Sequence, residues 1–129
     1  MDAEKIIRII VNAYQERDLE TVLEFISDDI VFINNADPDS APHCARVSNK
    51  EEFVAYLKEI DECWDIQQFQ INQLLVNGDD VATRSLMDYV SKNTGRRVVT
   101  QGAHFWTVKE SKVIRIHEFY DTAAIGARK

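Results

Sequence analysis

The C-terminal half of the chain alternates β-type segments with short turns, and this pattern constrains the fold more than any other feature. Four segments rich in β-branched and aromatic residues lie at 65–76, 81–91, 97–108 and 112–120. The polar stretches between them are Asn77-Gly78-Asp79-Asp80, Asn93-Thr94-Gly95 and Lys109-Glu110-Ser111-Lys112. Such stretches favour hairpin turns. We therefore expect an antiparallel meander of four strands.

The N-terminal half predicts helices instead. Apolar side chains in residues 2–17 recur at the i, i+3, i+4, i+7 spacing of an amphipathic helix. A shorter helix follows from Leu19 to about Ile26, then a short strand at 30–33, and a third helix begins after Ser48-Asn49. Residues 34–47 form the longest irregular segment, and long loops often cover sites. Helices followed by a meander predict a single α+β domain over residues 1–129.

Composition excludes several kinds of partner. The net charge of −7 argues against nucleic acid, since phosphate binding requires a basic surface. We also expect no membrane association, because no apolar run approaches the roughly 20 residues of a membrane span. Asp2 and Glu4 do not fit an export signal, so we expect a cytoplasmic protein. Cys44 and Cys63 are isolated, which favours free thiols and gives no reason to expect a metal or another cofactor.

One carboxylate stands out in the last strand. Alternation places Glu118 on the same face as Ile114, Ile116 and Tyr120, and places Val113, Arg115, His117, Phe119 and Asp121 on the other. A buried carboxylate costs free energy unless it is paired or lines a wet cavity. Glu118 is therefore an acid or base in a pocket, a partly exposed residue at the rim, or a residue paired with a neighbouring basic group.

The order of elements also carries a resemblance. The features concerned are Arg17-Asp18-Leu19 between two helices, Ser27-Asp28-Asp29 before a strand, and a meander ending in Glu118-Phe119-Tyr120-Asp121. With these features the chain resembles the nuclear transport factor 2-like superfamily. Within that superfamily it is similar to the branch of SnoaL-like polyketide cyclases, ketosteroid isomerases and limonene-epoxide hydrolases. The resemblance implies a cone-shaped α+β barrel, with three N-terminal helices packed into a strongly curved antiparallel sheet.

The catalytic residues of ketosteroid isomerases are absent at the matching positions. The resemblance places their general-base Asp at Asn34, their Tyr on the first helix at Ile10, and their protonated Asp at Ala103. Steroid isomerisation is therefore not expected.

Limonene-epoxide hydrolases give a different comparison. Their Arg-x-Asp pair falls at Ser85 and Met87, but their second Asp, on the last strand, is matched conservatively by Glu118. SnoaL-like cyclases also carry a base Asp there. The chain therefore keeps the acidic residue of the last strand but lacks the residues that usually assist it.

These comparisons lead to a candidate site. Glu118 is the candidate acid or base, while Asn34 and Tyr14 are candidates to hold a ligand carbonyl or hydroxyl. Asn34 could instead be a turn residue, and Tyr14 a core residue with its hydroxyl at the edge. The residues expected to line an apolar pocket are Phe32, Trp64, Met87, Tyr89, Ala103, Phe105, Ile116 and Tyr120.

The outer face of the sheet is predicted to be a dimer interface. We assign Val98, Trp106, Val108 and Phe119 to this face, which would then be too apolar for solvent. His104 is assigned there as well, beside Trp106. Three hypotheses remain: an enzyme of the SnoaL-like kind acting on an apolar carbonyl or epoxide-like substrate, a non-catalytic module that binds an apolar ligand, and a domain that binds a protein partner through the outer face.

Overall fold

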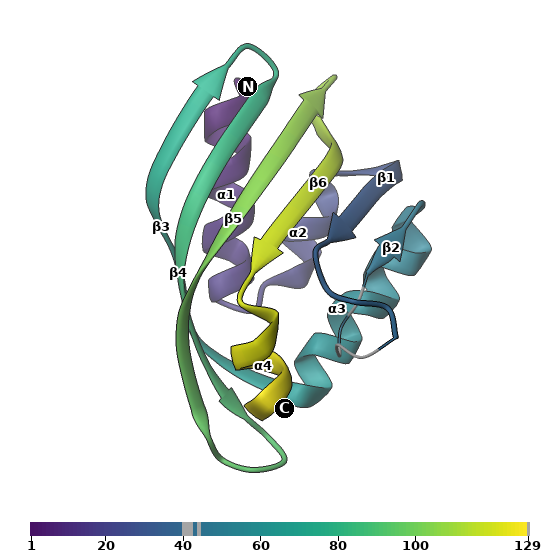
Figure 1. The fold of residues 1–129 in the computed structure, drawn as a ribbon. Coiled ribbons are helices and arrows are strands. Elements are labelled where there is room, and N and C mark those ends of the chain that lie inside the picture. Colours follow the sequence, from purple (N-terminus) through teal and green to yellow (C-terminus); the bar gives the residue numbers. More distant parts are fainter. Residues whose placement is uncertain (40–42, 44, 129) are drawn as a thin grey trace.

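The fold is known from a computed structural model that describes residues 1–39, 43 and 45–128. Its elements are, in order, α1 (Ala3–Gln15), α2 (Leu19–Glu24), β1 (Ile26–Asn34), β2 (Arg46–Val47), α3 (Lys50–Cys63), β3 (Trp64–Asn77), β4 (Asp80–Ser91), β5 (Arg97–Lys109), β6 (Lys112–Tyr120) and α4 (Thr122–Arg128). A single curved, unclosed sheet wraps around the N-terminal helices (Figure 1). The predicted α+β cone is confirmed. Cys44 lies outside the described residues.

Each N-terminal helix begins at a side chain that caps it. Asp2 accepts a hydrogen bond from the backbone N–H of Lys5, and Asp18 caps α2 in the same way. Asn49 accepts from the N–H of Glu52 at 2.8 Å, at the helix start that the sequence predicted. The apolar stripe of α1, which includes Ile6 and Ile7, is fully buried against the sheet.

The sheet has six strands in the order β2-β1-β6-β5-β4-β3. The four C-terminal strands form the predicted antiparallel meander, but β1 pairs with β6 in parallel. Strand β1 also begins at Ile26, earlier than expected, because Ile26 pairs with Val113 and is buried in the core. The parallel pair brings Asn34, at the end of β1, opposite Glu118.

The predicted faces of β5 are reversed. His104 and Trp106 are 3% and 5% exposed and face the helices, whereas Phe105 is 53% exposed on the outer face. The physical reason lies in alternation, because Arg97 and Lys109 share the parity of Phe105 and their charges require solvent. The same alternation buries Val98 and Val108 and places Ala103 outside.

The alternation of β6 is interrupted near its start. Val108 pairs with Val113 and Thr107 pairs with Arg115, so the register shifts at Ile114. Val113 therefore turns into the core and is fully buried, while Ile114 is half-buried, contrary to prediction. From Arg115 onward the predicted faces hold, so Ile116 and Glu118 are buried.

A C-terminal helix that the sequence did not predict follows the last strand. Asp121 accepts a hydrogen bond from the N–H of Ala124 at 3.0 Å and so caps α4. The helix continues from the end of β6 and lies beside β5 (Figure 1), and its Ile125 is 4% exposed. In the described part of the chain, none of the helices is both long and apolar enough to cross a membrane.

Candidate functional site

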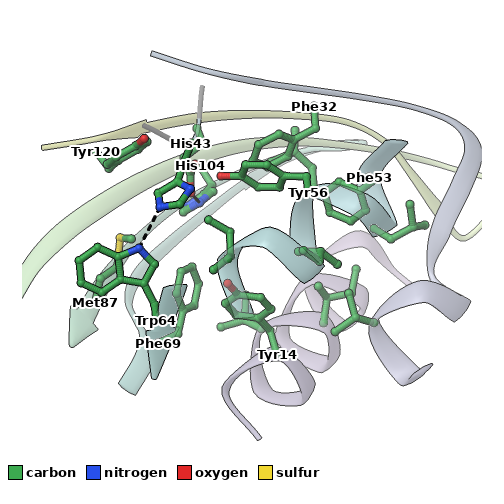
Figure 2. Close-up of a pocket in the computed structure, with 18 of the residues that line it drawn as sticks. Tyr14, Phe32, His43, Phe53, Tyr56, Trp64, Phe69, Met87, His104 and Tyr120 are labelled. Atoms are coloured by element: carbon green, nitrogen blue, oxygen red, sulfur yellow. Dashed lines mark hydrogen bonds and ion pairs between the residues drawn. The ribbon is translucent and has the colours of Figure 1, made fainter. Parts of the chain in front are cut away.

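The concave face of the sheet and the helices enclose a cavity of about 90 Å³. Aromatic rings make up much of its wall: β1, α3, β3, β4, β5 and β6 contribute Phe32, Phe53, Tyr56, Trp64, Phe69, Tyr89, Trp106 and Tyr120, and α1 contributes Tyr14. The remaining lining residues are mostly aliphatic. Figure 2 shows these rings converging from several elements on one space. The interior is therefore suited to an apolar ligand.

The polar centre of the cavity is a His–Glu pair. Nε2 of His104 on β5 lies 2.8 Å from Oε2 of Glu118 on β6, because the two residues pair directly across the strands. Their side chains are only 4% and 11% exposed. Nδ1 of His104 has no hydrogen-bond partner among the described residues. A buried polar atom of this kind is costly without a partner, so it marks where a ligand group could bind.

All four tyrosines of the chain line the same cavity. Burial raises the pKa of Tyr14 to about 12, although the nearby Arg17 guanidinium opposes this rise. Burial likewise raises the pKa of Tyr56 and of Tyr89, and the charge of Glu118 adds to both shifts. The hydroxyl groups of Tyr14 and Tyr56 point toward the middle of the cavity (Figure 2). Because their pKa values are raised, these hydroxyl groups stay protonated and can donate hydrogen bonds inside the cavity.

Asn34 holds the segment that follows β1. Its Oδ1 accepts from the backbone N–H groups of Ala36 at 3.2 Å and Ala45 at 3.1 Å. Its Nδ2 donates to the carbonyl of His43 at 2.8 Å, and also reaches the Tyr56 hydroxyl at 3.4 Å. Asn34 is 1% exposed and lies behind the cavity wall. Both ends of its amide are hydrogen-bonded to the protein, and its link to the cavity is the hydrogen bond that it donates to the Tyr56 hydroxyl.

His43 completes the wall on that side. Trp64 donates from Nε1 to Nε2 of His43 at 3.0 Å, which joins His43 to the start of β3 (Figure 2). Nδ1 of His43 lies 3.7 Å from a carboxylate oxygen of Glu59. The backbone of His43 has a positive φ of 60°, an uncommon conformation for a residue other than glycine. The surrounding hydrogen bonds hold this conformation in place.

The structure brings together most, but not all, of the residues that the sequence singled out. Glu118 and Tyr14 line the cavity, together with Phe32, Trp64, Met87, Tyr89, Ile116 and Tyr120. Ala103 and Phe105 do not, because they point to the outer face of β5. Trp106, which we assigned to a dimer interface, lies inside with its Nε1 donating to Thr83 Oγ1 at 3.0 Å.

Several cavity residues were missed from the sequence. His104 is the most consequential, and the signal was the parity it shares with Trp106, opposite to that of Arg97 and Lys109. Tyr56 lies on α3 at helical spacing from Phe53 and Ile60, so helical periodicity was its signal. His43 had no comparable signal, because the turn that brings it to the cavity depends on tertiary contacts.

The described part of the chain contains no cluster of three or more His, Cys, Asp or Glu side chains arranged to hold a metal ion. The cavity residues with titratable groups are His43, His104, Glu118 and the tyrosines. Side chains of these types can form hydrogen bonds and exchange protons.

Comparison with known structures agrees with this fold. An NTF2-like protein from Burkholderia thailandensis E264 matches with a TM-score of 0.87 and 21% identity, over 99% of this chain and 97% of that chain. TerC, which was co-crystallised with polyporic acid, matches with a TM-score of 0.86 and 15% identity over 98% and 96% of the two chains. An LEH-like epoxide hydrolase from M. tuberculosis matches with a TM-score of 0.77 and 17% identity over 95% and 84%. At these identities the likeness establishes the fold alone.

Comparison with family sequence models gives evidence for the family as well as the fold. No curated protein matches the sequence significantly. The sequence model of the SnoaL-like domain, however, matches residues 7–116, which is most of the chain. The cone, its apolar interior and this match agree, and the chain belongs to the SnoaL-like domain family.

Proposed function

We propose that the protein is a small-molecule enzyme that moves a proton on an uncharged, apolar carbonyl or hydroxyl compound inside the cone. The observation that carries the proposal is the buried His104–Glu118 pair, with its Nε2–Oε2 distance of 2.8 Å, at the wall of an apolar cavity. Burying such a pair away from water costs free energy, and function is a common reason to keep one.

The pair defines which atom acts as the base. An ionised Glu118 only accepts hydrogen bonds, so it selects the tautomer of His104 that carries its proton on Nε2. The lone pair then lies on Nδ1, which has no partner among the described residues. His104 is thus the catalytic base of the proposal. Glu118, which the sequence singled out, orients the imidazole and stabilises the imidazolium that forms.

The reaction step follows from these roles. Nδ1 of His104 takes a proton from a carbon next to the substrate carbonyl, the C–H electrons form a C=C bond, and the carbonyl oxygen becomes an enolate. The Tyr56 hydroxyl accepts from Asn34 Nδ2 at 3.4 Å, which leaves its own proton free to donate to that oxygen. The imidazolium then returns the proton to carbon or to oxygen, so charge and atoms balance.

Charge in the cavity favours an uncharged substrate. None of the described residues that line it is Lys or Arg, and Glu118 repels anions. A phosphate or carboxylate group would therefore lie in this interior without a cation to pair with. An apolar ring compound with one carbonyl or hydroxyl fits better.

The test is exchange of α-protons for deuterium in D₂O, followed by NMR with small ring ketones as probes. This readout reports proton abstraction whatever the natural substrate is. Glu118→Gln and His104→Gln should each lower the exchange rate about 100- to 10,000-fold. The matched controls are Glu110→Gln in an exposed turn and His117→Gln on the outer face, which should leave the rate unchanged. Rates within about tenfold of wild type in both folded cavity variants would overturn the proposal.

A non-catalytic binding module is the second candidate. The observation that favours it is the set of hydrogen bonds between the Asn34 amide and the protein backbone. A ligand group could bind Asn34 only by breaking these buried hydrogen bonds, which costs free energy. On this view the wild-type protein binds ring ketones without exchanging their protons. Glu118→Gln should then leave affinity within about tenfold, or roughly 1.4 kcal/mol.

The outer face also supports a homodimer, with Phe119 as expected but with Phe105 in place of the buried Trp106. Phe105 and Phe119 pack edge to face at 6.0 Å and remain 53% and 38% exposed. Val99, farther along the same face of β5, is 56% exposed. Exposed apolar residues gathered on one sheet face are typical of an interface. Phe105→Asp should yield a monomer on a sizing column. A wild-type protein that is already monomeric at micromolar concentration would contradict the dimer.

A further inference from the structure

The cavity is smaller than a ring-sized ligand requires. Its volume is about 90 Å³, whereas an engineered cavity that admits benzene measures about 150 Å³. A ring compound can therefore enter only if part of the wall yields. The part of the wall that moves sets the size of the ligand that can enter. This question rests on the proposed function only in assuming that a ligand enters the cone.

Hydrogen bonds fix much of the wall. Trp64 is bonded to His43, His104 to Glu118, and Trp106 to Thr83. To move, any of these rings must break a buried hydrogen bond, which costs free energy.

The aliphatic side chains of the wall are not held by hydrogen bonds. Most of its residues are Ile or Val, which are stiff about their first side-chain torsion. Among the described lining residues, only Leu57 and Met87 are aliphatic and unbranched at Cβ. A methionine is the more adaptable of the two, because its thioether chain has three soft torsions and low barriers. Met87 is thus the wall residue best able to move.

Gly102 gives Met87 a place to lie. The two residues are diagonal neighbours on β4 and β5, since Met87 pairs with Thr100 and Ser85 pairs with Gly102. A Cβ atom on residue 102 would lie only 2.5 Å from Met87 Sδ and 3.5 Å from Cε1 of His104. The thioether therefore occupies the space that any larger residue at 102 would fill. That space also borders the imidazole of the His104–Glu118 pair.

We propose that the Met87–Gly102 pair determines how large a ligand the cone accepts, and that the ligand is an uncharged compound of a single ring. The thioether of Met87, which lies over Gly102, moves aside to make room for one ring beside His104. The same side chain closes the cavity to a second fused ring. A side chain at 102 would push the thioether back into the cavity.

The experiment measures binding by isothermal titration calorimetry with two uncharged ketones, cyclohexanone with one ring and 2-decalone with two fused rings. Cyclohexanecarboxylate is the charged control. Both tryptophans of the chain, Trp64 and Trp106, line the cavity, so their fluorescence gives a second readout of ligand entry. The variants are Met87→Ala, Gly102→Ala and the double variant. Leu86→Ala is the matched control, because Leu86 is half-buried next to Met87 on the opposite face of β4.

Wild type should prefer cyclohexanone, and Met87→Ala should shift the preference toward 2-decalone at least about tenfold, the scale of a few methylene groups in an apolar pocket. Gly102→Ala should weaken both ketones at least about tenfold, and the double variant should bind like Met87→Ala, because the loss acts through the thioether. Leu86→Ala should change neither affinity.

An unchanged preference in Met87→Ala would overturn the inference, as would a loss from Gly102→Ala that persists without Met87. If Gly102→Ala fails to fold, the comparison of Met87→Ala with its control Leu86→Ala still tests the inference. Absence of ketone binding in both wild type and Met87→Ala would refute this inference along with the proposed function. Normal size selection without deuterium exchange would refute the proposed function alone.

Discussion

The two faces of the sheet carry similar residues in different surroundings. On the inner face, His104 lies between Phe69 and Trp106, with ring centroids 5.5 and 5.6 Å away, and pairs with Glu118. On the outer face, His117 stacks on Phe119 at 4.5 Å. The outer face also has its own ionic pair, in which Arg97 donates to both carboxylate oxygens of Asp88 at 2.8 and 2.6 Å. Residue types alone therefore do not separate the faces.

Access to water separates them. The Asp88 side chain is only 6% exposed, but that of Arg97 is 65% exposed, so solvent screens the guanidinium and weakens the contribution of the pair to stability. The His104–Glu118 pair is closed off from water, where electrostatic interactions are stronger and an unpaired charge is expensive. The two pairs thus differ mainly in the exposure of the basic side chain, which is 65% for Arg97 and 4% for His104.

The largest predicted difference between the faces is in packing. Ile116 is 3% exposed on the inner face, so Ile116→Ala should lower the free energy of unfolding by about 2–5 kcal/mol. Arg115 is its exposed neighbour on the outer face, and Arg115→Ala should change stability by no more than about 0.5 kcal/mol. Urea denaturation of both variants tests this. Equal losses would mean that the two faces are not distinguished by packing.

High pH should affect the inner face. The pKa of Tyr14 is raised to about 12 by burial, above the ordinary value of 10.0. Its contribution to stability is therefore complete below about pH 10 and is lost as the pH rises through 12, because the unfolded chain ionises first. Unfolding measured at pH 8, 10 and 11.5 should show a smaller loss in Tyr14→Phe than in wild type. Identical pH profiles would indicate that the Tyr14 hydroxyl is not buried.

Low pH should affect the outer face, and more weakly. Hydrogen bonds from Arg97 hold the pKa of Asp88 below its ordinary value of 3.8. The stability this pair provides is present above that value and is lost as the pH falls through the lowered pKa. Asp88→Asn should therefore differ slightly from wild type at pH 7 and converge with it in strong acid. A difference that stays constant down to pH 2 would exclude the ion pair as its cause.

Much of the fold was predictable because it rests on local patterns. Helical periodicity, capping residues such as Asn49 and the turn at Asn77-Gly78 each specify structure over a few residues. The faces of β5 were assigned wrongly although the charges of Arg97 and Lys109 indicate the correct parity. The register shift at Ile114 had no such signal, because it depends on how β5 and β6 pair.

The candidate site was less predictable than the fold. Glu118 stood out as a carboxylate in an apolar row, but its partner His104 belongs to another strand and pairs with it only through tertiary register. His43 reaches the cavity through the hydrogen bonds of Asn34, and Ile125 through a helix that forms on the folded barrel. Short-range sequence patterns contain none of these relations.

We propose that Glu118 holds His104 as a neutral base with its lone pair on Nδ1, and ¹⁵N NMR of the imidazole can detect this state. The signals can be assigned by comparison with His104→Gln, and the exposed His117 serves as an internal reference. Near pH 7.5 we expect a protonated Nε2 and a bare Nδ1 for His104, and we expect Glu118→Gln to weaken this preference. A proton on Nδ1 with a bare Nε2, or protons on both nitrogens, would contradict it.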